Sequence, residues 1–331
     1  MSNTKYTYAV ARIRALETSL LNDAVIGQLL ACGTAEQALQ LLIDRGWGDP
    51  SAENDMESVL KCEEEKTWQV IRDVAPDMSV FDVLLYPRLY HNLKAAVKAV
   101  CTGVKNPRIF YDDCPIPGEE MMRIVEGKEF LRLPGNMSRT AQEAMDILLH
   151  TGDGQLCDIC VDKAALEAAA EAGKRSGERI IEEYADTTVA IADIKIAVRA
   201  QKTGKSAEFM RSAMAECSSL NVGQLIRAAL AGEDEIAQYL QETSYAGGAE
   251  ALKTSPSAFE RWCDNRMIET MKPQKYETFS VGPLLWYLIA RENEIKTVRI
   301  ILTGKQNGFS DDAIRERIRE MYVYDCSDGR L

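Results

Sequence analysis

The sequence predicts an all-α protein, and three observations carry that prediction. Apolar residues recur at helical spacing along most of the 331 residues, residue types that favour helices are abundant, and no alternating strand–loop–strand pattern appears. Proline and glycine number only 10 and 21, and they gather in short breaks between the expected helices. Because the chain is too long for one typical domain, we expect two or three packed units.

Local signals indicate where several helices begin. In residues 311–323, Ile314, Ile318 and Met321 fall on one helical face with Arg and Glu opposite, after a start at Ser310. Other starts are expected at capping boxes, in which Ser or Thr is followed three residues later by Glu or Gln. These boxes are Thr34 with Gln37, Thr140 with Glu143, and Ser257 with Glu260.

The balance of charge excludes some classes of partner. The formal net charge is −12, from 51 acidic and 39 basic residues, which gives no general attraction to nucleic acid or anionic lipid. The nine cysteines are odd in number and scattered, which favours reduced thiols in a cytoplasmic protein over a disulfide framework.

No segment is predicted to target or cross a membrane. The N-terminus lacks the apolar core of a signal peptide. The most apolar stretch near the C-terminus, Gly282 to Ala290, is far shorter than the roughly 20 residues that a spanning helix needs. We therefore expect any contact with a membrane to be made through a partner.

An internal repeat is the most informative feature. Residues 92–103 (NLKAAVKAVCTG), 193–204 (DIKIAVRAQKTG) and 293–304 (NEIKTVRIILTG) align without gaps on their terminal glycines. Each copy begins with Asn or Asp, carries valine at its sixth position and a cation at its seventh, and ends in Thr-Gly. The pattern predicts a helix with basic last turns, ended by a glycine suited to the left-handed C-terminal position.

The spacing of the copies predicts the organisation of the chain. A period of about 100 residues is the size of a domain and too long for the short stacked helical arrays. We therefore expect three similar helical units related by approximate threefold symmetry. Their approximate boundaries are 1–115, with the N-terminal unit closed on the C-terminal helices, then 116–215 and 216–331.

Motifs that carry catalysis are missing, so no catalytic residue, cofactor site or metal site is predicted. There is no GxxxxGK(S/T) phosphate loop, because Gly304-Lys305 lacks the upstream glycine and is followed by Gln306. The two histidines, His91 and His150, lie far apart in sequence and are interpreted as surface or packing residues.

One cysteine pair leaves an alternative open. Cys157 and Cys160 form a CxxC motif at the head of an alanine-rich helical stretch, without a second pair or a neighbouring strand. Two free thiols near a helix start are the favoured interpretation. Zinc binding or redox chemistry is the alternative.

Charged residues in helices also allow two interpretations. The runs Glu63-Glu64-Glu65 and Glu182-Glu183 are typical of solvated helix faces. The repeat cations can be solvated or salt-bridged in the same way. Their recurrence in an acidic protein equally favours a role in docking a partner.

Both ends of the chain resemble one known family. Residues 6–17 (YTYAVARIRALE) are similar to the N-terminal signature of the C subunit of V/A-type ATP synthases, whose eukaryotic counterpart is the d subunit of vacuolar ATPases. Residues 283–305 (PLLWYLIARENEIKTVRIILTGK) and 314–322 (IRERIREMY) resemble its C-terminal signature. Chain length and the threefold repeat agree with this resemblance.

The resemblance implies a fold and a role. It implies a funnel of three helical domains on the cytoplasmic side of the membrane, seated on the rotor ring of proteolipid subunits. The central shaft, made of subunits D and F, would insert into the funnel, and the protein would transmit torque without an active site of its own. Residues expected to line or support the central surface are Arg12, Arg14, Asn92, Lys98, Asp193, Arg199, Asn293 and Arg299. A helical interaction scaffold unrelated to rotary ATPases is the alternative.

Overall fold

A computed structural model describes residues 4–51, 55–104, 106, 109–111 and 114–321. Every regular element within these residues is a helix, so the predicted all-α class is confirmed. The chain divides into two compact units, which we call the first unit (within 1–78 and 251–331) and the second unit (within 79–250).

The first unit joins the two ends of the chain around one long helix. Its central helix α15 packs against α1, α3, α4, α14 and α16. Apolar side chains from α2, α3, the start of α4 and the second half of α15 form its core, with Trp47 and Ile314. The helices of this unit are α1 (Thr7–Glu17), α2 (Asp23–Ala31), α3 (Ala35–Ile43), α4 (Met56–Val74), α14 (Pro256–Met271), α15 (Gly282–Gln306) and α16 (Asp311–Arg315).

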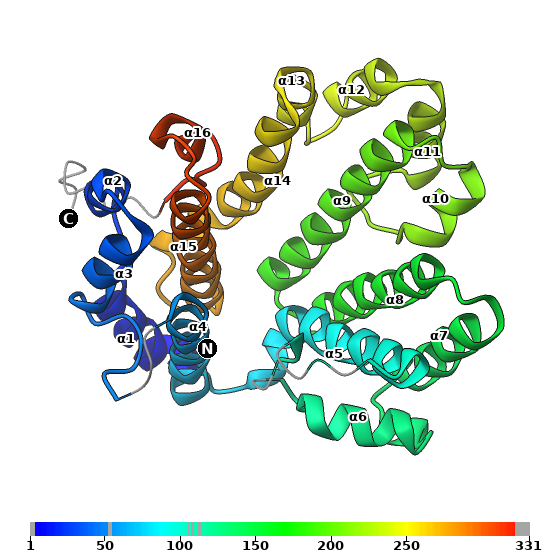
Figure 1. Cartoon of the computed structure of the whole chain (residues 1–331), viewed down its shortest axis with the longest axis horizontal. Helices are drawn as coiled ribbons and strands as arrows, with labels where there is room; N and C mark the ends of the chain where they lie inside the picture. Colours follow the sequence, from blue (N-terminus) through cyan, green and yellow to red (C-terminus); the bar gives the residue numbers. More distant parts are fainter. Residues whose placement is uncertain (1–3, 52–54, 105, 107–108, 112–113, 322–331) are drawn as a thin grey trace. The chain divides into compact units, whose positions relative to one another are not determined.

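The second unit is built on three long helices, α5, α8 and α9. In Figure 1, α8 lies between α5 and α9, and it packs against both. The core of α5, α6, α7 and α8 is apolar and includes Met121, Val161 and Cys157. The helices are α5 (Asp82–Thr102), α6 (Gly118–Glu126), α7 (Met137–Thr151), α8 (Gly154–Arg175), α9 (Arg179–Lys202), α10 (Ala207–Ala213), α11 (Val222–Ala231) and α12 (Glu233–Gln241).

Helix α13 (Gly247–Thr254) covers the sequence position at which the second unit ends. Short 3-10 turns, η1 (Thr4–Tyr6), η2 (Met78–Phe81), η4 (Phe130–Arg132) and η5 (Lys272–Tyr276), connect or precede several helices. The predicted division into units 1–115, 116–215 and 216–331 stays a prediction.

The predicted helix starts are partly correct. Thr34 caps α3 by accepting from the Gln37 N–H, and the Gln37 side chain accepts from the Gly33 N–H. Ser310 caps α16 by accepting from the Ala313 N–H at 3.3 Å. In both places a hydroxyl satisfies an N–H group that the first turn leaves without a helical partner.

The other two capping boxes were wrong. Thr140 lies inside α7, where its hydroxyl donates to the Asn136 carbonyl instead of capping. Helix α14 begins two residues earlier than predicted, because Ser255 is the cap and Pro256 occupies the first turn, where a proline has no N–H to lose. The helix expected from Ser310 is also short, since α16 ends at Arg315.

The repeat forms the second half of three long helices. In the first two copies the predicted C-terminal glycine is confirmed, since Gly103 and Gly204 have φ of 74° and 62°. The preceding threonines help to end the helices, because the Thr102 and Thr203 hydroxyls donate to the carbonyls four residues earlier, at 2.7 and 2.8 Å.

The third copy departs from this prediction. Gly304 lies inside α15, which continues to Gln306, and Gly308 supplies the left-handed residue with φ of 68°. Gly304 serves a packing need instead, because a Cβ added there would lie 2.7 Å from Cγ1 of Ile314 in α16. Its lack of a side chain thus allows α16 to approach α15.

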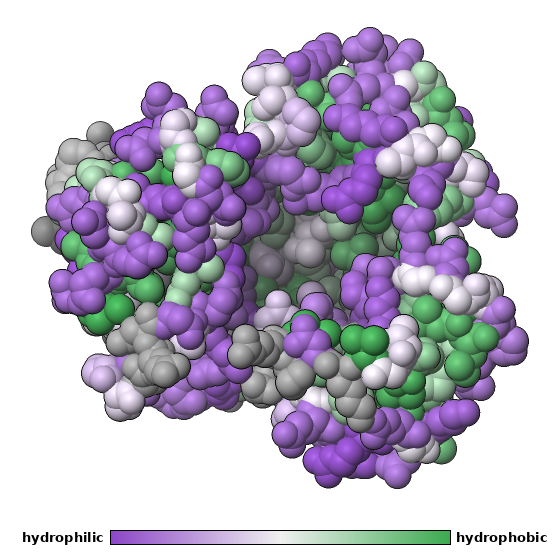
Figure 2. All heavy atoms as spheres, in the orientation of Figure 1, coloured by the Kyte–Doolittle hydropathy of each residue, from purple (hydrophilic) through white to green (hydrophobic). Residues whose placement is uncertain are grey.

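None of the helices in the described part of the chain combines the length and the apolar character that spanning a bilayer requires. The face shown in Figure 2 is covered largely by hydrophilic side chains, with smaller apolar areas among them. This distribution is that of helices packed on their own cores with polar faces outward.

Candidate functional site

The eight predicted residues fall into both units. The first unit holds Arg12, Arg14, Asn293 and Arg299, and the second holds Asn92, Lys98, Asp193 and Arg199. They differ in burial, since Asn92, Asp193 and Asn293 are buried, whereas Arg12 and Arg199 are exposed. The buried polar residues of the repeat are therefore placed to contact the interior of the protein, whereas an exposed cation such as Arg199 is placed to contact solvent or a partner.

Asn92 holds the segment that follows its helix. Its Nδ2 donates to the Tyr111 carbonyl at 2.7 Å and lies 3.4 Å from the Ile116 carbonyl. Its Oδ1 accepts from the Tyr111 N–H at 2.9 Å, and Nδ2 also contacts Cys114 Sγ at 3.0 Å. One buried amide thus satisfies several backbone groups that lie about 20 residues downstream.

Asp193 and Asn293 occupy the same position and act on the same kind of target. Asp193 Oδ1 accepts from the Ala215 N–H at 3.2 Å, 22 residues downstream. Asn293 Nδ2 donates to the Glu320 carbonyl at 2.6 Å, 27 residues downstream. In each copy, then, a buried polar side chain of the long helix attaches the returning chain to that helix. We call these three residues the repeat latches.

The repeat latches support the fold rather than facing solvent. A buried hydrogen bond of this kind contributes about 1 kcal/mol, and leaving its partner unsatisfied costs about 1–3 kcal/mol. Because less than a tenth of the surface of each of the three residues is exposed, they are not available to bind a partner directly. Sequence reasoning found these positions but could not decide which way they point.

Most cations of the repeat form ion pairs within their own unit. Lys98 of α5 lies 2.5 Å from Asp158 of α8, and Arg299 of α15 binds both carboxylate oxygens of Glu57 in α4 at 2.6 and 2.7 Å. The neighbouring Lys94 and Lys296 pair with Asp162 and Asp264 in the same way. Such exposed pairs contribute roughly 0–1 kcal/mol each.

Arg199 and Arg12 differ from these cations. Both side chains are exposed, and the structure shows neither in an ion pair or hydrogen bond with another described residue. Arg14, by contrast, binds Glu17 at 2.8 Å and donates to the Glu277 carbonyl at 2.9 Å, so it connects α1 to the chain before α15. The docking role proposed for the repeat cations stays a prediction, and Arg199 is its most accessible member.

The CxxC thiols are shielded. Burial, the main cause, raises the pKa of both Cys157 and Cys160 to about 11, with nearby carboxylates adding to the effect. At neutral pH both are therefore protonated, whereas metal binding and disulfide exchange require the thiolate. Among the described residues, no group of three or more His, Cys, Asp or Glu side chains is placed to hold a metal ion.

The two histidines have local contacts. His91 Nε2 lies 2.8 Å from the Ile109 carbonyl, and the ring packs edge-on against Tyr111. His150 Nδ1 lies 2.8 Å from the Asp146 carbonyl, one turn earlier on α7. These contacts agree with the interpretation of both as surface or packing residues.

Lys305, which follows the third Thr-Gly, has a structural partner. Its ammonium donates to the carbonyls of Leu30 and Cys32 at the end of α2, at 2.7 Å for Leu30, and its side chain is only 5% exposed. A cation at this place satisfies carbonyls that the last helical turn leaves free. Lys305 therefore anchors α2 to α15.

A buried ionic network in the first unit was missed by the sequence reasoning. Arg291 of α15 donates to Glu63 of α4 and to Glu294, and its Nε lies 3.3 Å from the Thr67 hydroxyl. All three charged side chains are less than a tenth exposed. The expectation of a solvated face at residues 63–65 was therefore wrong for Glu63, because Arg291 lies opposite it.

The network also attaches two loops. Glu63 accepts from the Gly48 N–H at 2.9 Å and from Lys66, which donates to the Gly46 and Gly48 carbonyls. Glu294 accepts from the Leu21 N–H. Burial alone would lower the pKa of Arg291, but the carboxylates of Glu294 and Glu63 outweigh it and raise the pKa.

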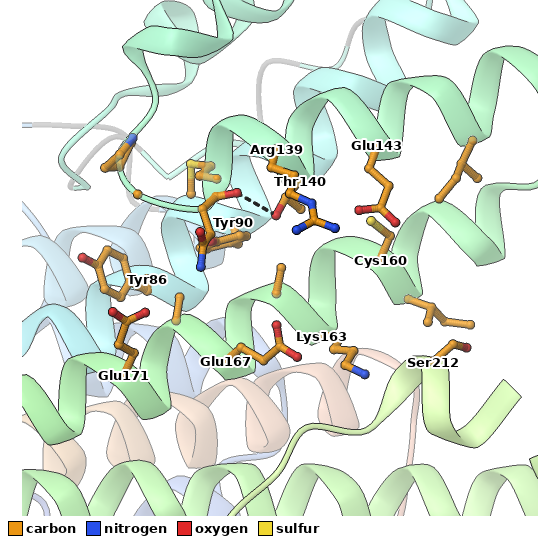
Figure 3. A pocket seen from close by; sticks show the side chains of 18 of the residues that line it. Tyr86, Tyr90, Arg139, Thr140, Glu143, Cys160, Lys163, Glu167, Glu171 and Ser212 are labelled. Atoms are coloured by element: carbon orange, nitrogen blue, oxygen red, sulfur yellow. Dashed lines mark hydrogen bonds between the residues drawn. The ribbon is translucent and has the colours of Figure 1, made fainter. Parts of the chain in front are cut away.

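A groove of about 770 Å³ lies in the second unit between α7 and α8. In Figure 3, Glu143 from α7 and Glu167 and Lys163 from α8 lie along this groove. Tyr90 from α5 forms a side-chain hydrogen bond with Thr140. Burial and the charges of Glu167 and Glu171 raise the pKa of Tyr90 to about 12, so its hydroxyl stays neutral. Acidic and basic side chains are balanced along the lining.

Fold and site together define an all-helical protein with an internal repeat, whose recurrent polar residues hold its own backbone. Several relatives match nearly the whole chain, among them three C subunits. The C subunit of a V-type sodium ATPase from Enterococcus hirae is 22% identical over 94% of this chain and 97% of its own. The C subunits of A-type ATP synthases from Methanocaldococcus jannaschii and Desulfurococcus sp. (strain SY) are each 24% identical, covering 94% and 96% of this chain and 85% and 92% of theirs.

The family described as ATP synthase (C/AC39) subunit matches residues 9–317. Because the match includes nearly the whole chain, the protein belongs to this family of V/A-type ATP synthase subunits. The resemblance inferred from the two ends of the sequence is thereby confirmed.

Proposed function

We propose that the chain is the non-catalytic central-stalk subunit of a rotary V/A-type ATPase or ATP synthase. In this role it forms a socket between the central shaft and the membrane proteolipid ring, and it transmits torque for ATP-coupled transport of H⁺ or Na⁺. The observation that carries the proposal is the family match over residues 9–317. Its partners would be shaft subunits D and F and the ring. Its location would be cytoplasmic, with membrane contact made only through the ring.

A part that transmits torque must resist shear between its helices. The internal contacts of both units supply such resistance, since the repeat latches hold returning segments and Arg291 binds together α15, α4 and two loops. Long helices packed at the density of a protein interior deform little. These features support a mechanical role, as does the absence of a phosphate-loop motif in the sequence.

The three-unit funnel belongs to the same proposal. Three long helices with equivalent latches, spaced about 100 residues apart, are what approximate threefold symmetry requires. We propose that units near 1–115, 116–215 and 216–331 surround a central opening that receives the shaft. Exposed cations such as Arg199 would then contact acidic surfaces of the ring or shaft.

Copurification tests the proposal. The chain is tagged in its native host, membranes are solubilised in mild detergent, and the proteins recovered with the tag are identified by mass spectrometry. Recovery of the ATPase head subunits, subunits D and F and the proteolipid is expected. Recovery of soluble partners alone would favour the alternative, a helical interaction scaffold unrelated to rotary ATPases.

A further inference from the structure

The second repeat latch has a chemistry that the other two lack. Asn92 and Asn293 each donate an amide N–H to a carbonyl of the segment that they hold. Asp193 lies at the equivalent position with no exposed surface, and it acts only as an acceptor, from Ala215. Its second oxygen, Oδ2, is buried and has no hydrogen-bond partner among the residues that the structure describes.

We propose that Asp193 is a protonation-dependent latch, which holds the chain at Ala215 against α9 while its carboxyl group is neutral and releases it when ionised. A neutral carboxyl group can leave one oxygen without a partner at modest cost. A carboxylate in the same place lacks the solvation that its charge requires, and opening of the segment restores contact with water. The amides of Asn92 and Asn293 cannot change charge, so their segments lack this response.

The charged groups around Asp193 do not neutralise it. Lys163 of α8 is the nearby cation, but its ammonium donates to the Arg211 carbonyl at 2.9 Å. The held segment contributes Glu216 and Cys217, and Asp186 of α9 acts on the Cys217 thiol, whose pKa it raises. Burial, the largest cause, raises the pKa of Asp193 to about 7, with Glu216 raising it further and the Ala215 N–H and Lys163 lowering it.

A second carboxylate limits how far the segment can open. Asp186, two turns earlier on α9, accepts from the Ser218 N–H and hydroxyl at 2.5 and 2.7 Å and from the Ser219 N–H at 3.2 Å. Although burial opposes it, these bonds lower the pKa of Asp186, which therefore stays ionised across the neutral range. Release is thus confined to the chain around Ala215, beside a cleft of about 440 Å³ lined by Glu216 and Asn221.

The direction of the effect follows from linkage. Below about pH 4 the carboxyl group is protonated in both the closed and the open segment, and opening does not depend on pH. Between about pH 4 and pH 7 the open form ionises while the closed form stays protonated, so opening increases with pH. Above about pH 7 both forms are ionised, and the dependence ends.

Hydrogen–deuterium exchange of the full-length protein tests this inference. Protection factors are measured near pH 5.5 and near pH 8, after correction for intrinsic exchange, in peptides covering residues 212–220. The wild type is expected to lose protection there by on the order of tenfold toward pH 8. Asp193→Asn is expected to keep the same protection at both pH values. The peptide covering residues 316–321, held by Asn293, is the control within the same molecule.

A second variant places an aspartate at the equivalent position of the third copy, and this test does not depend on how Asp193→Asn folds. Asn293→Asp is expected to create a loss of protection with rising pH at residues 316–321, because an ionised carboxylate cannot donate to the Glu320 carbonyl. An unchanged pH response in Asp193→Asn, or none in the wild type at 212–220, would overturn the proposal. The inference does not rest on the proposed rotary function.

Discussion

Arg291 of α15 and Glu63 of α4 form an ion pair inside the first unit, with Nη2 2.5 Å from Oε2 and both side chains less than a tenth exposed. The guanidinium also donates to the Glu294 carboxylate and lies close to the Thr67 hydroxyl. Its Cζ lies over the Trp47 ring, 5.2 Å from the ring centroid. This single side chain connects a C-terminal helix to N-terminal elements more than 200 residues away.

Removing Arg291 should therefore destabilise the protein strongly. Arg291→Ala leaves Glu294 buried without its cation and leaves Glu63 with Lys66 alone, and a loss of about 3–5 kcal/mol in the free energy of unfolding is expected. Arg299→Ala, two turns along the same helix, breaks only an exposed pair with Glu57 and should cost at most about 1 kcal/mol. Urea unfolding of both variants checks this difference, and equal losses would contradict the assignment of the buried network.

Adding a single methyl group at Gly304 should destabilise the protein. Gly304→Ala places a Cβ 2.7 Å from Ile314 Cγ1, and the resulting overpacking is expected to cost about 1–3 kcal/mol. The double variant Gly304→Ala/Ile314→Val removes a methylene from the opposing side chain and should recover part of that loss, which a double-mutant cycle detects. Additive effects of the two changes would show that α16 does not approach α15 at this glycine.

Arg199 should matter more for assembly than the paired cations of the repeat. Reversal of charge at Lys98, Arg199 and Arg299 together is expected to weaken attachment to the shaft or ring while leaving helicity unchanged by circular dichroism. Arg199→Glu alone should produce most of this loss, because its exposed guanidinium is free to meet a partner. Copurification of a tagged chain measures the effect. Full assembly of the triple variant would end the docking role for these cations.

Cys157 and Cys160 should be poor nucleophiles in the folded protein. Because burial raises the pKa of both thiols to about 11, only about one thiol in a thousand is ionised at pH 8. Their reaction with a disulfide reagent should be slow and should accelerate about tenfold per pH unit below pH 11. Mass spectrometry of the labelled peptides checks this. Rapid labelling at neutral pH, or stoichiometric zinc in the purified protein, would restore the alternative of redox or metal chemistry.

Much of the fold could be predicted because helical periodicity and the repeat are local in sequence. The all-α class, the glycines at 103 and 204, and the caps at Thr34 and Ser310 all depend on neighbours within a turn or two. Thr140 and Ser257 fit the same capping pattern, but the helix starts predicted from them were wrong, because the pattern alone does not show where the preceding chain turns.

The features that sequence reasoning missed depend on distant partners. Glu63 belongs to an acidic run and has no local sign of burial, since its cation comes from Arg291, 228 residues away. In the same way, Gly304 matches the Thr-Gly pattern but is used for the approach of Ile314. The repeat latches were found as recurrent residues, yet their backbone targets lie 19, 22 and 27 residues downstream of the latch residues themselves.

The position of the chain in an assembled complex tests the central proposal most directly. Electron cryomicroscopy of the detergent-solubilised complex, purified through a tag on this chain, would locate it. The proposal predicts density for the chain on the rotation axis, in contact with the proteolipid ring on one side and with the shaft on the other. A location off the axis, or a complex that lacks the ring and shaft, would contradict it.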